Sequence, residues 1–272
     1  MKIGTCKLTL KPGKFVKSHM IPLAFSAPSE GCYFIDGAPG GRPTRRPTSW
    51  YDRELVTRSG EDILADLDSF AATELRKARL VWSGWEKETV LKDNIFQYPD
   101  SDQLVRLVPD LDALKLRVFF LSLLWRAAAS EMPQYANIKL QECELEKLRL
   151  MVLNRNPYPL SLFPVHLTQM ITRGARHNLG PLEMNTPMDF GSGNGALMLN
   201  SYRFYFDGLI ANIHTNVSER FHAEASAIYV GGDSIVIANC IKFEDSFQAS
   251  NMIQHGCEAF MNHQSTMLKL LK

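Results

Sequence analysis

The spacing of apolar residues along this chain is helical over its middle part. Between residues 60 and 80, apolar positions such as Ile63, Leu67 and Phe70 recur every three or four residues, with acidic residues at the start and basic residues at the end. That spacing and charge order favour a helix because they match the helical repeat and the helix dipole. We predict a helix over 60–80 with Ser59 as its N-cap.

Three further segments predict helices. Residues 110–130 are apolar on nearly every side, which is typical of a helix buried at the centre of a domain. Residues 140–154 fit an amphipathic helix, and the turn-forming residues and two prolines that follow predict its end. A closing helix is expected over about 244–271.

Shorter, strand-like spacing occurs near both ends of the chain. Residues 5–22 fit a short pair of strands around a turn at 11–13. Residues 202–213 fit a strand, and residues 227–238 fit a hairpin around Gly-Gly-Asp-Ser at 231–234. The pattern therefore predicts an α+β fold.

Composition agrees with a packed globular fold. The chain has 272 residues, of which 45% are hydrophobic and 22% charged, and a chain of this length can bury a large core without a metal or a disulfide. We predict two parts. Residues 1–80 form a small ββα-like basic module, and residues 81–272 form a larger domain of mixed helices and antiparallel sheet with the buried helix at its centre.

No segment predicts a membrane span or a signal peptide. The most apolar run, residues 118–125, is eight residues long, whereas a span needs roughly 20. The first residues are basic but lack the apolar region of a signal peptide. Five scattered cysteines without a Cys-x-x-Cys pair fit reduced thiols. We therefore expect a cytoplasmic protein that does not contact a membrane.

Charge is distributed unevenly. Residues 1–60 carry ten Lys and Arg against four acidic residues, whereas residues 181–272 carry five against nine. The N-terminal part is thus the part expected to meet a polyanion, although a solvated basic surface would give the same count. Arginines at three positions between prolines suit bidentate contacts to nucleic-acid phosphates, with a solvated loop as the alternative: Arg42, Arg45 and Arg46.

The order of motifs in the N-terminal part is strand, Ser-His-Met-Ile-Pro at 18–22, basic loop, Tyr-Asp at 51–52, helix. In this order, and in the segment Leu-Ser-Leu-Leu-Trp-Arg-Ala at 121–127, the chain resembles a group of poorly characterised bacterial HNH-type proteins. Their pattern adds two Cys-x-x-Cys knuckles. The resemblance implies a ββα-metal nuclease fold, a nucleic-acid partner and a role in defence or in mobile elements, such as phage defence.

The chain departs from that pattern at the knuckles. The resemblance places zinc-binding cysteines at four positions, but only Cys6 is present, and the other positions hold Thr9, Thr57 and Gly60. Structural zinc needs four ligands in a tetrahedron. We therefore expect no structural zinc, with apolar packing in its place.

The resemblance implies that His19 is the general base of a metal-dependent phosphodiesterase. The helix over 60–80 lacks the second histidine of such enzymes, but Asp52 and Glu61 offer oxygen ligands that Mg²⁺ prefers. Each residue also has a structural interpretation. His19 could be a hydrogen-bonded turn residue, and an acidic residue at a helix start complements the dipole.

These observations leave three hypotheses. The first is a nucleic-acid-binding protein with a degenerate HNH-like module, which would act as an endonuclease if its metal site is functional. The second is a non-catalytic scaffold or interaction protein of a bacterial complex, with a protein partner or as a homodimer. The third places an enzyme site near His214, Glu219, His222 and Glu224, which match no defined metal site and which we predict to be surface residues.

Overall fold

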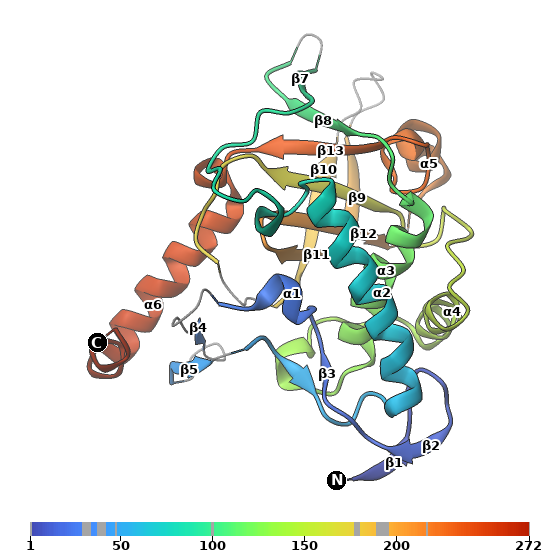
Figure 1. Ribbon diagram of the computed structural model, residues 1–272, viewed down its shortest axis with the longest axis vertical. Helices are drawn as coiled ribbons and strands as arrows, with labels where there is room; N and C mark the ends of the chain where they lie inside the picture. Colours follow the sequence, from blue (N-terminus) through green and yellow to red (C-terminus); the bar gives the residue numbers. More distant parts are fainter. Residues whose placement is uncertain are drawn as a thin grey trace.

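A mixed seven-stranded sheet with helices packed on it forms the larger part of the molecule (Figure 1). The structure is a computed structural model. It describes residues 2–28, 34–36, 42–46, 48–98, 101–176, 180–188, 196–215 and 217–271.

The sheet has the strand order β10-β11-β12-β9-β13-β8-β7, and all neighbouring pairs are antiparallel except β13 and β9. The α+β class is therefore confirmed. The sheet is not purely antiparallel, and it includes two strands that precede the central helix and that the sequence pattern did not reveal. Its strands are β7 (Ile95–Gln97), β8 (Leu104–Val108), β9 (Val165–Met170), β10 (Leu182–Met188), β11 (Leu197–Phe206), β12 (Leu209–Thr215) and β13 (Val236–Ile241).

Helix α3 (Ala113–Ala129) lies at the centre of the core, as its apolar sequence predicts. Asp112 caps its N-terminus by accepting a hydrogen bond of 2.9 Å from the Lys115 amide. The ring of Phe119 packs edge-on against Phe206 of the sheet. The amphipathic helix α4 (Glu142–Leu153) packs along α3, and both helices fall where they were predicted.

Two strand predictions were wrong. Residues 202–213 are not one strand but parts of β11 and β12, joined by a tight turn at Asp207 and Gly208, both with positive φ. An Asp-Gly pair fits such a turn because both residues tolerate left-handed backbone. Residues 227–238 do not form a hairpin. A 3₁₀ turn, η3 (Ser226–Ile228), precedes a loop, and β13 begins only at Val236.

The N-terminal module contains three two-stranded sheets and the long helix α2. The predicted turn at 11–13 was wrong, because Pro12 and Gly13 lie within β2 and residues 6–11 make the connection. Helix α2 begins one residue after Thr57, so Ser59 is not its N-cap. The elements are β1 (Ile3–Thr5), β2 (Pro12–Lys14), β3 (Ser18–His19), α1 (Leu23–Ser26), β4 (Phe34–Asp36), β5 (Thr44–Arg46), β6 (Tyr51–Asp52) and α2 (Arg58–Lys77).

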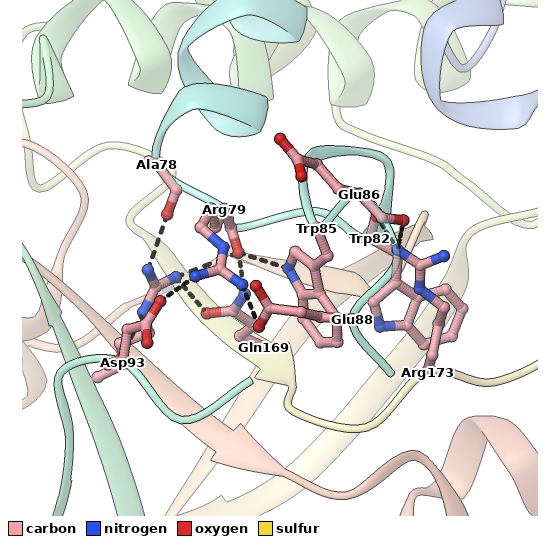
Figure 2. A network of polar contacts seen from close by, with 10 residues as sticks. Ala78, Arg79, Trp82, Trp85, Glu86, Glu88, Asp93, Gln169 and Arg173 are labelled. Carbon is pink, nitrogen blue, oxygen red and sulfur yellow. Dashed lines mark hydrogen bonds and ion pairs between the residues drawn. The ribbon is translucent and has the colours of Figure 1, made fainter. Parts of the chain in front are cut away.

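The end of α2 is fixed to the sheet by a network of polar contacts (Figure 2). The carbonyl oxygen of Arg79, a residue with φ of 55°, accepts three hydrogen bonds. The donors are Nε1 of Trp85 at 2.8 Å, Nε2 of Gln169 at 2.6 Å and Nη1 of Arg106 at 3.2 Å. Arg106 also donates to the carbonyl of Ala78 at 2.8 Å. These bonds satisfy carbonyls that a helix end leaves unpaired and hold α2 in one position.

The remaining elements follow the sheet or connect its strands. The last helix, α6 (Phe247–Leu270), is close to its predicted range. Among the described residues, no helix combines the length and the apolar character needed to cross a membrane. The other elements are α5 (Glu219–Ala225) and the 3₁₀ turns η1 (Trp82–Gly84), η2 (Pro133–Tyr135) and η4 (Phe243–Asp245).

Candidate nucleic-acid interface

His19 lies on a two-stranded sheet beside α2. Strand β3 pairs antiparallel with β6, so that His19 is opposite Tyr51 and Ser18 is opposite Asp52. Successive side chains of a strand alternate between faces. The rings of His19 and Tyr51 accordingly meet edge-on, with centroids 6.0 Å apart. Asp52 instead accepts a 2.7 Å hydrogen bond from the hydroxyl of Ser130, at the end of α3.

Three cationic side chains lie over the rings of Tyr51 and its neighbour Trp50. Lys17 Nζ lies 3.8 Å from the ring centroid, and the Arg53 guanidinium lies 5.4 Å from it while donating a 3.3 Å hydrogen bond to the phenol oxygen. Arg46 stacks on the neighbouring Trp50 at 3.5 Å. We call Lys17, Arg46 and Arg53 the cationic cluster.

The charges of this cluster affect the pKa of Tyr51. The hydrogen bond from Arg53 and its charge, followed by the charges of Lys17 and Arg46, lower the pKa of Tyr51. A phenol pKa lowered by neighbouring cations means that the local potential is positive. The surface beside His19 therefore favours an anion.

The structure separates the three arginines of the basic loop. Arg46 belongs to the cationic cluster, whereas Arg45 donates from Nε to the carbonyl of Leu270, at the end of α6, at 3.1 Å. Arg42 is exposed, just before β5. Residues 37–41 of the loop lie outside the described part of the chain. The sequence indicated the cationic loop, but it did not indicate Lys17 and Arg53, which join Arg46 only because β3 pairs with β6.

His19 has the properties of a neutral base. Burial, then the charge of Lys17, lowers its pKa; Arg126 adds to this effect and Asp68 opposes it. Nε2 is buried and has no hydrogen-bond partner among the described residues. A neutral imidazole can act as a base, but a ligand reaches Nε2 only if the side chain moves, because that nitrogen is buried.

The carboxylates proposed for Mg²⁺ do not assemble beside His19. Asp52 faces the other side of its sheet, where its oxygens accept from Ser130 and from the amide of Glu54. Burial raises the pKa of Glu61, outweighing the hydroxyl of Ser18, so the charged form that a cation needs is disfavoured. No group of three potential metal ligands occurs within the described ranges. These residues do not fit a magnesium site.

An ion pair connects α3 to the module. Arg126 donates from Nη2 to Oδ1 of Asp68, on α2, at 2.5 Å and from Nη1 to the carbonyl of His19 at 3.0 Å. Its side chain is almost fully buried, at 1% exposed, against 20% for Asp68. Arg126 belongs to the segment 121–127, so this segment lies directly against the strand that carries His19.

The four positions that correspond to zinc ligands lie together. The amide of Thr9 donates to Sγ of Cys6 at 3.4 Å, and a Cβ placed on Gly60 would lie 2.6 Å from the same sulfur. Burial raises the pKa of the Cys6 thiol, but hydrogen bonds from Thr9 and the backbone of Thr57 outweigh it, and the pKa is lowered. The Cys6 sulfur therefore packs against Gly60 at the place where the resemblance would put a zinc ion. Cys32 lies outside the described residues.

The histidines near residue 220 are not all on the surface. His214 is 2% exposed, so its prediction as a surface residue was wrong. Its Nε2 lies 2.6 Å from Nδ1 of His166, which the sequence did not single out, and Asn212 donates to Nε2 of His166 at 3.2 Å. His222 contacts the hydroxyl of Tyr229 at 3.1 Å instead. Glu219 lies in the first turn of α5, where its charge complements the helix dipole.

Burial keeps the histidine pair neutral. It lowers the pKa of His166 to about 4, and burial together with the neighbouring ring lowers that of His214 to about 2. Because the two neutral imidazoles are hydrogen-bonded to each other, the nitrogens of that bond are not available to bind a cation. The side chain of Glu224 is not among those described, and the described residues bring no third metal ligand to this pair.

Comparisons of the chain with protein-family models, with curated proteins and with solved structures find no match.

Proposed function

We propose that residues 1–80 bind the phosphates of a nucleic acid through the cationic cluster. The observation that carries this proposal is that Lys17 and Arg53 lie over the ring of Tyr51 and Arg46 over that of the adjacent Trp50, next to His19. Lysine and arginine supply most of the affinity of proteins for nucleic acids, because each neutralised phosphate releases a counterion.

The resemblance to HNH-type proteins supports the same proposal. The strands that carry His19 and Tyr51 pair with each other and are followed by α2, in the ββα order. Arg126, from the segment 121–127 that shares the resemblance, donates a hydrogen bond to the carbonyl of His19. A cytoplasmic role in defence or mobile elements is part of this proposal, and free thiols at Cys6, Cys143, Cys240 and Cys257 agree with it.

Binding without cleavage is the form of the proposal that the geometry supports. His19 could act as a base, but Asp52 and Glu61 do not form a magnesium site with it. An HNH-type reaction needs a metal at the phosphate as well as a base. We therefore assign His19 to the binding surface, and cleavage is left to the experiment.

Fluorescence anisotropy with labelled duplex DNA and with single-stranded RNA tests the proposal. Alanine at Lys17, Arg46 and Arg53 together should weaken binding at least about tenfold, because three phosphate contacts are lost. A matched control removes three positive charges from exposed lysines of the sheet-bearing part: Lys87, Lys92 and Lys242. Equal affinities of the two triple variants would contradict a binding site at the cationic cluster.

Cleavage is measured on the same samples with Mg²⁺, Mn²⁺ or EDTA. Binding without turnover is the expected result. Turnover that is lost in EDTA and in His19→Ala would instead establish a working nuclease and assign the base. If the wild type neither binds nor cleaves, the alternative of a non-catalytic scaffold for a protein partner replaces the proposal.

A further inference from the structure

The large sheet has a second face, which points away from α3. Successive side chains of a strand alternate between the two faces. Leu167 of β9 packs in the core with the residues of α3, so its neighbours His166 and Thr168 lie on the second face. The strands on either side of β9 follow the same alternation.

Among the described residues, hydrophobic clusters cover the second face at its two ends. At one end, Phe221 of α5 packs with Leu199 of β11. At the other end, Phe243 of η4 packs with Met170 and Ile210. Figure 1 shows α5 and the start of α6, which follows η4, at opposite ends of β13. The middle of the face is therefore left to other side chains.

The side chains in the middle of the second face are mostly polar. Arg203 of β11 is opposite Asn212 of β12, and Asn212 is opposite His166 of β9. Two residues further along β9, Thr168 lies beside Asn239 of β13. Except for His166, these residues are half-buried, so solvent reaches them. We call the four half-buried residues the polar row: Arg203, Asn212, Thr168 and Asn239.

Arg203 lacks a counter-ion. Its guanidinium lies 5.3 Å from the ring centroid of Phe247, and its Nε is buried without a hydrogen-bond partner. None of the described residues accepts a hydrogen bond from it. Directly opposite it lie Leu182 on one neighbouring strand and Asn212 on the other, and neither is charged. Burial lowers the pKa of Arg203, so its charge is partly removed from water without a carboxylate to compensate for it.

Other buried arginines of the chain are fully engaged. Arg106, Arg117 and Arg126 each donate several hydrogen bonds to carbonyl or side-chain oxygens. A buried polar group without a partner in the protein points to a water, an ion or a ligand that the group would bind. The planar fork of a guanidinium matches two oxygens of a carboxylate or a phosphate.

The rest of the polar row also offers hydrogen-bond donors. The hydroxyl of Thr168 bonds to none of the described residues. Asn239 accepts through Oδ1 from Gln103 at 3.1 Å, which leaves its Nδ2 available to donate. Asn212 donates from Nδ2 to His166 at 3.2 Å, which leaves its Oδ1 as an acceptor. The row therefore suits a ligand that has many oxygen atoms.

We propose that Arg203 binds the carboxylate or phosphate group of a small polar molecule whose other oxygen atoms contact Thr168 and Asn239. Three strand spacings of about 4.8 Å separate β11 from β13, or about 14 Å in all, which is the scale of a sugar phosphate held by extended side chains. A nucleic acid fits this row less well, because it is bound by several cations and the row has one. The site is independent of nucleic-acid binding, since the cationic cluster contributes no residue to this face.

Thermal unfolding tests the anion site in the Lys17→Ala/Arg46→Ala/Arg53→Ala background, where the cationic cluster cannot contribute. Millimolar sodium phosphate or sodium acetate is compared with sodium chloride at equal ionic strength, and the two salts distinguish a phosphate from a carboxylate site. We expect the preferred anion to raise the melting temperature by about 2 °C or more. Each variant is compared with its own melting temperature in chloride, so a change in its basal stability does not affect the result.

Substitutions assign the effect to Arg203. Arg203→Met should abolish the rise in melting temperature, and Arg203→Lys, which keeps the charge without the fork, should retain part of it. The control Arg155→Met removes one positive charge from an exposed residue after α4 and should keep the full rise. No rise with either anion, or a rise that persists in Arg203→Met, would overturn the proposal.

A longer probe tests the contacts beyond Arg203. Glucose 6-phosphate is compared with phosphate, and gluconate with acetate, at the same concentration. The longer probe should raise the melting temperature more, and Thr168→Val/Asn239→Leu should remove that difference while the rise from the simple anion remains. Equal rises with the short and the long probe would refute the contacts with Thr168 and Asn239.

Discussion

At the scale of single residues, buried cations bonded to main-chain carbonyls fix the packing. Arg117 is fully buried, and it donates to the carbonyls of Pro157 at 2.8 Å, Phe163 at 3.0 Å and Leu162 at 2.5 Å. Burial lowers its pKa to about 10, so it stays charged at neutral pH. Arg106 likewise donates to the carbonyl of Ala78 at the end of α2, and Arg126 donates to the carbonyl of His19 beside α2. No sequence pattern predicts such residues, because their partners are backbone groups from distant segments.

The histidine pair predicts a loss of stability in acid. The folded pKa values of His166 and His214 lie below the unfolded value of about 6.5, so the unfolded chain binds more protons once the pH falls below that value. Between pH 7 and pH 5 the pair should lower the free energy of unfolding by about 4 kcal/mol. Urea unfolding at the two pH values measures the change.

A variant separates this effect from other acid effects. His166→Gln/His214→Asn removes both titrating groups and should show a pH dependence smaller by that amount, whatever its own stability at pH 7. If the variant loses as much stability between pH 7 and pH 5 as the wild type, the pair is not the cause.

At the scale of elements, the helices could be predicted and several strands could not. Helices α2, α3 and α6 show periodicity or length that a strand cannot have, and their positions were close to the predicted ranges. The two-residue turn at Asp207 was hidden inside an apolar run, so β11 and β12 read as one strand. Strands β7 and β8 are short. Strand β8 pairs with β13, more than 100 positions later, and β7 joins the sheet only through β8, which local pattern does not reveal.

The candidate interface could likewise be predicted only in part from the sequence. His19 and the loop arginines stand out by motif and charge, and Arg46 does lie in the cationic cluster. Lys17 and Arg53 became part of it only through the pairing of β3 with β6, which are separated by more than 30 residues in the sequence. The opposite faces of His19 and Asp52 follow from that same register, which a sequence cannot fix for strands of two residues.

The turns around Cys6 make a prediction of their own. A Cβ placed on Gly60 would lie 2.6 Å from the Cys6 sulfur, which is closer than real Cβ contacts, so Gly60→Ala forces the helix and the sulfur apart. We expect Gly60→Ala to lower the free energy of unfolding by about 1–3 kcal/mol, measured by urea unfolding. The double variant Cys6→Ala/Gly60→Ala serves as the control, because removal of the sulfur relieves the overlap and should restore part of the loss. A Gly60→Ala variant as stable as the wild type would argue against this packing.

At the scale of the whole molecule, a hydrogen bond connects the basic loop with the last helix. Arg45 donates to the carbonyl of Leu270, so the end of α6 lies next to the strand that carries Arg46.

The central claim is that the cationic cluster contacts phosphates, and the salt dependence of binding tests it most directly. The slope of log affinity against log salt counts neutralised phosphates, at about 0.9 per contact on duplex DNA. We predict that Lys17→Ala/Arg46→Ala/Arg53→Ala reduces the magnitude of the slope by between about 2 and 3 relative to the wild type. The control Lys87→Ala/Lys92→Ala/Lys242→Ala should keep the wild-type slope. A slope unchanged by the loss of the cluster would contradict the account.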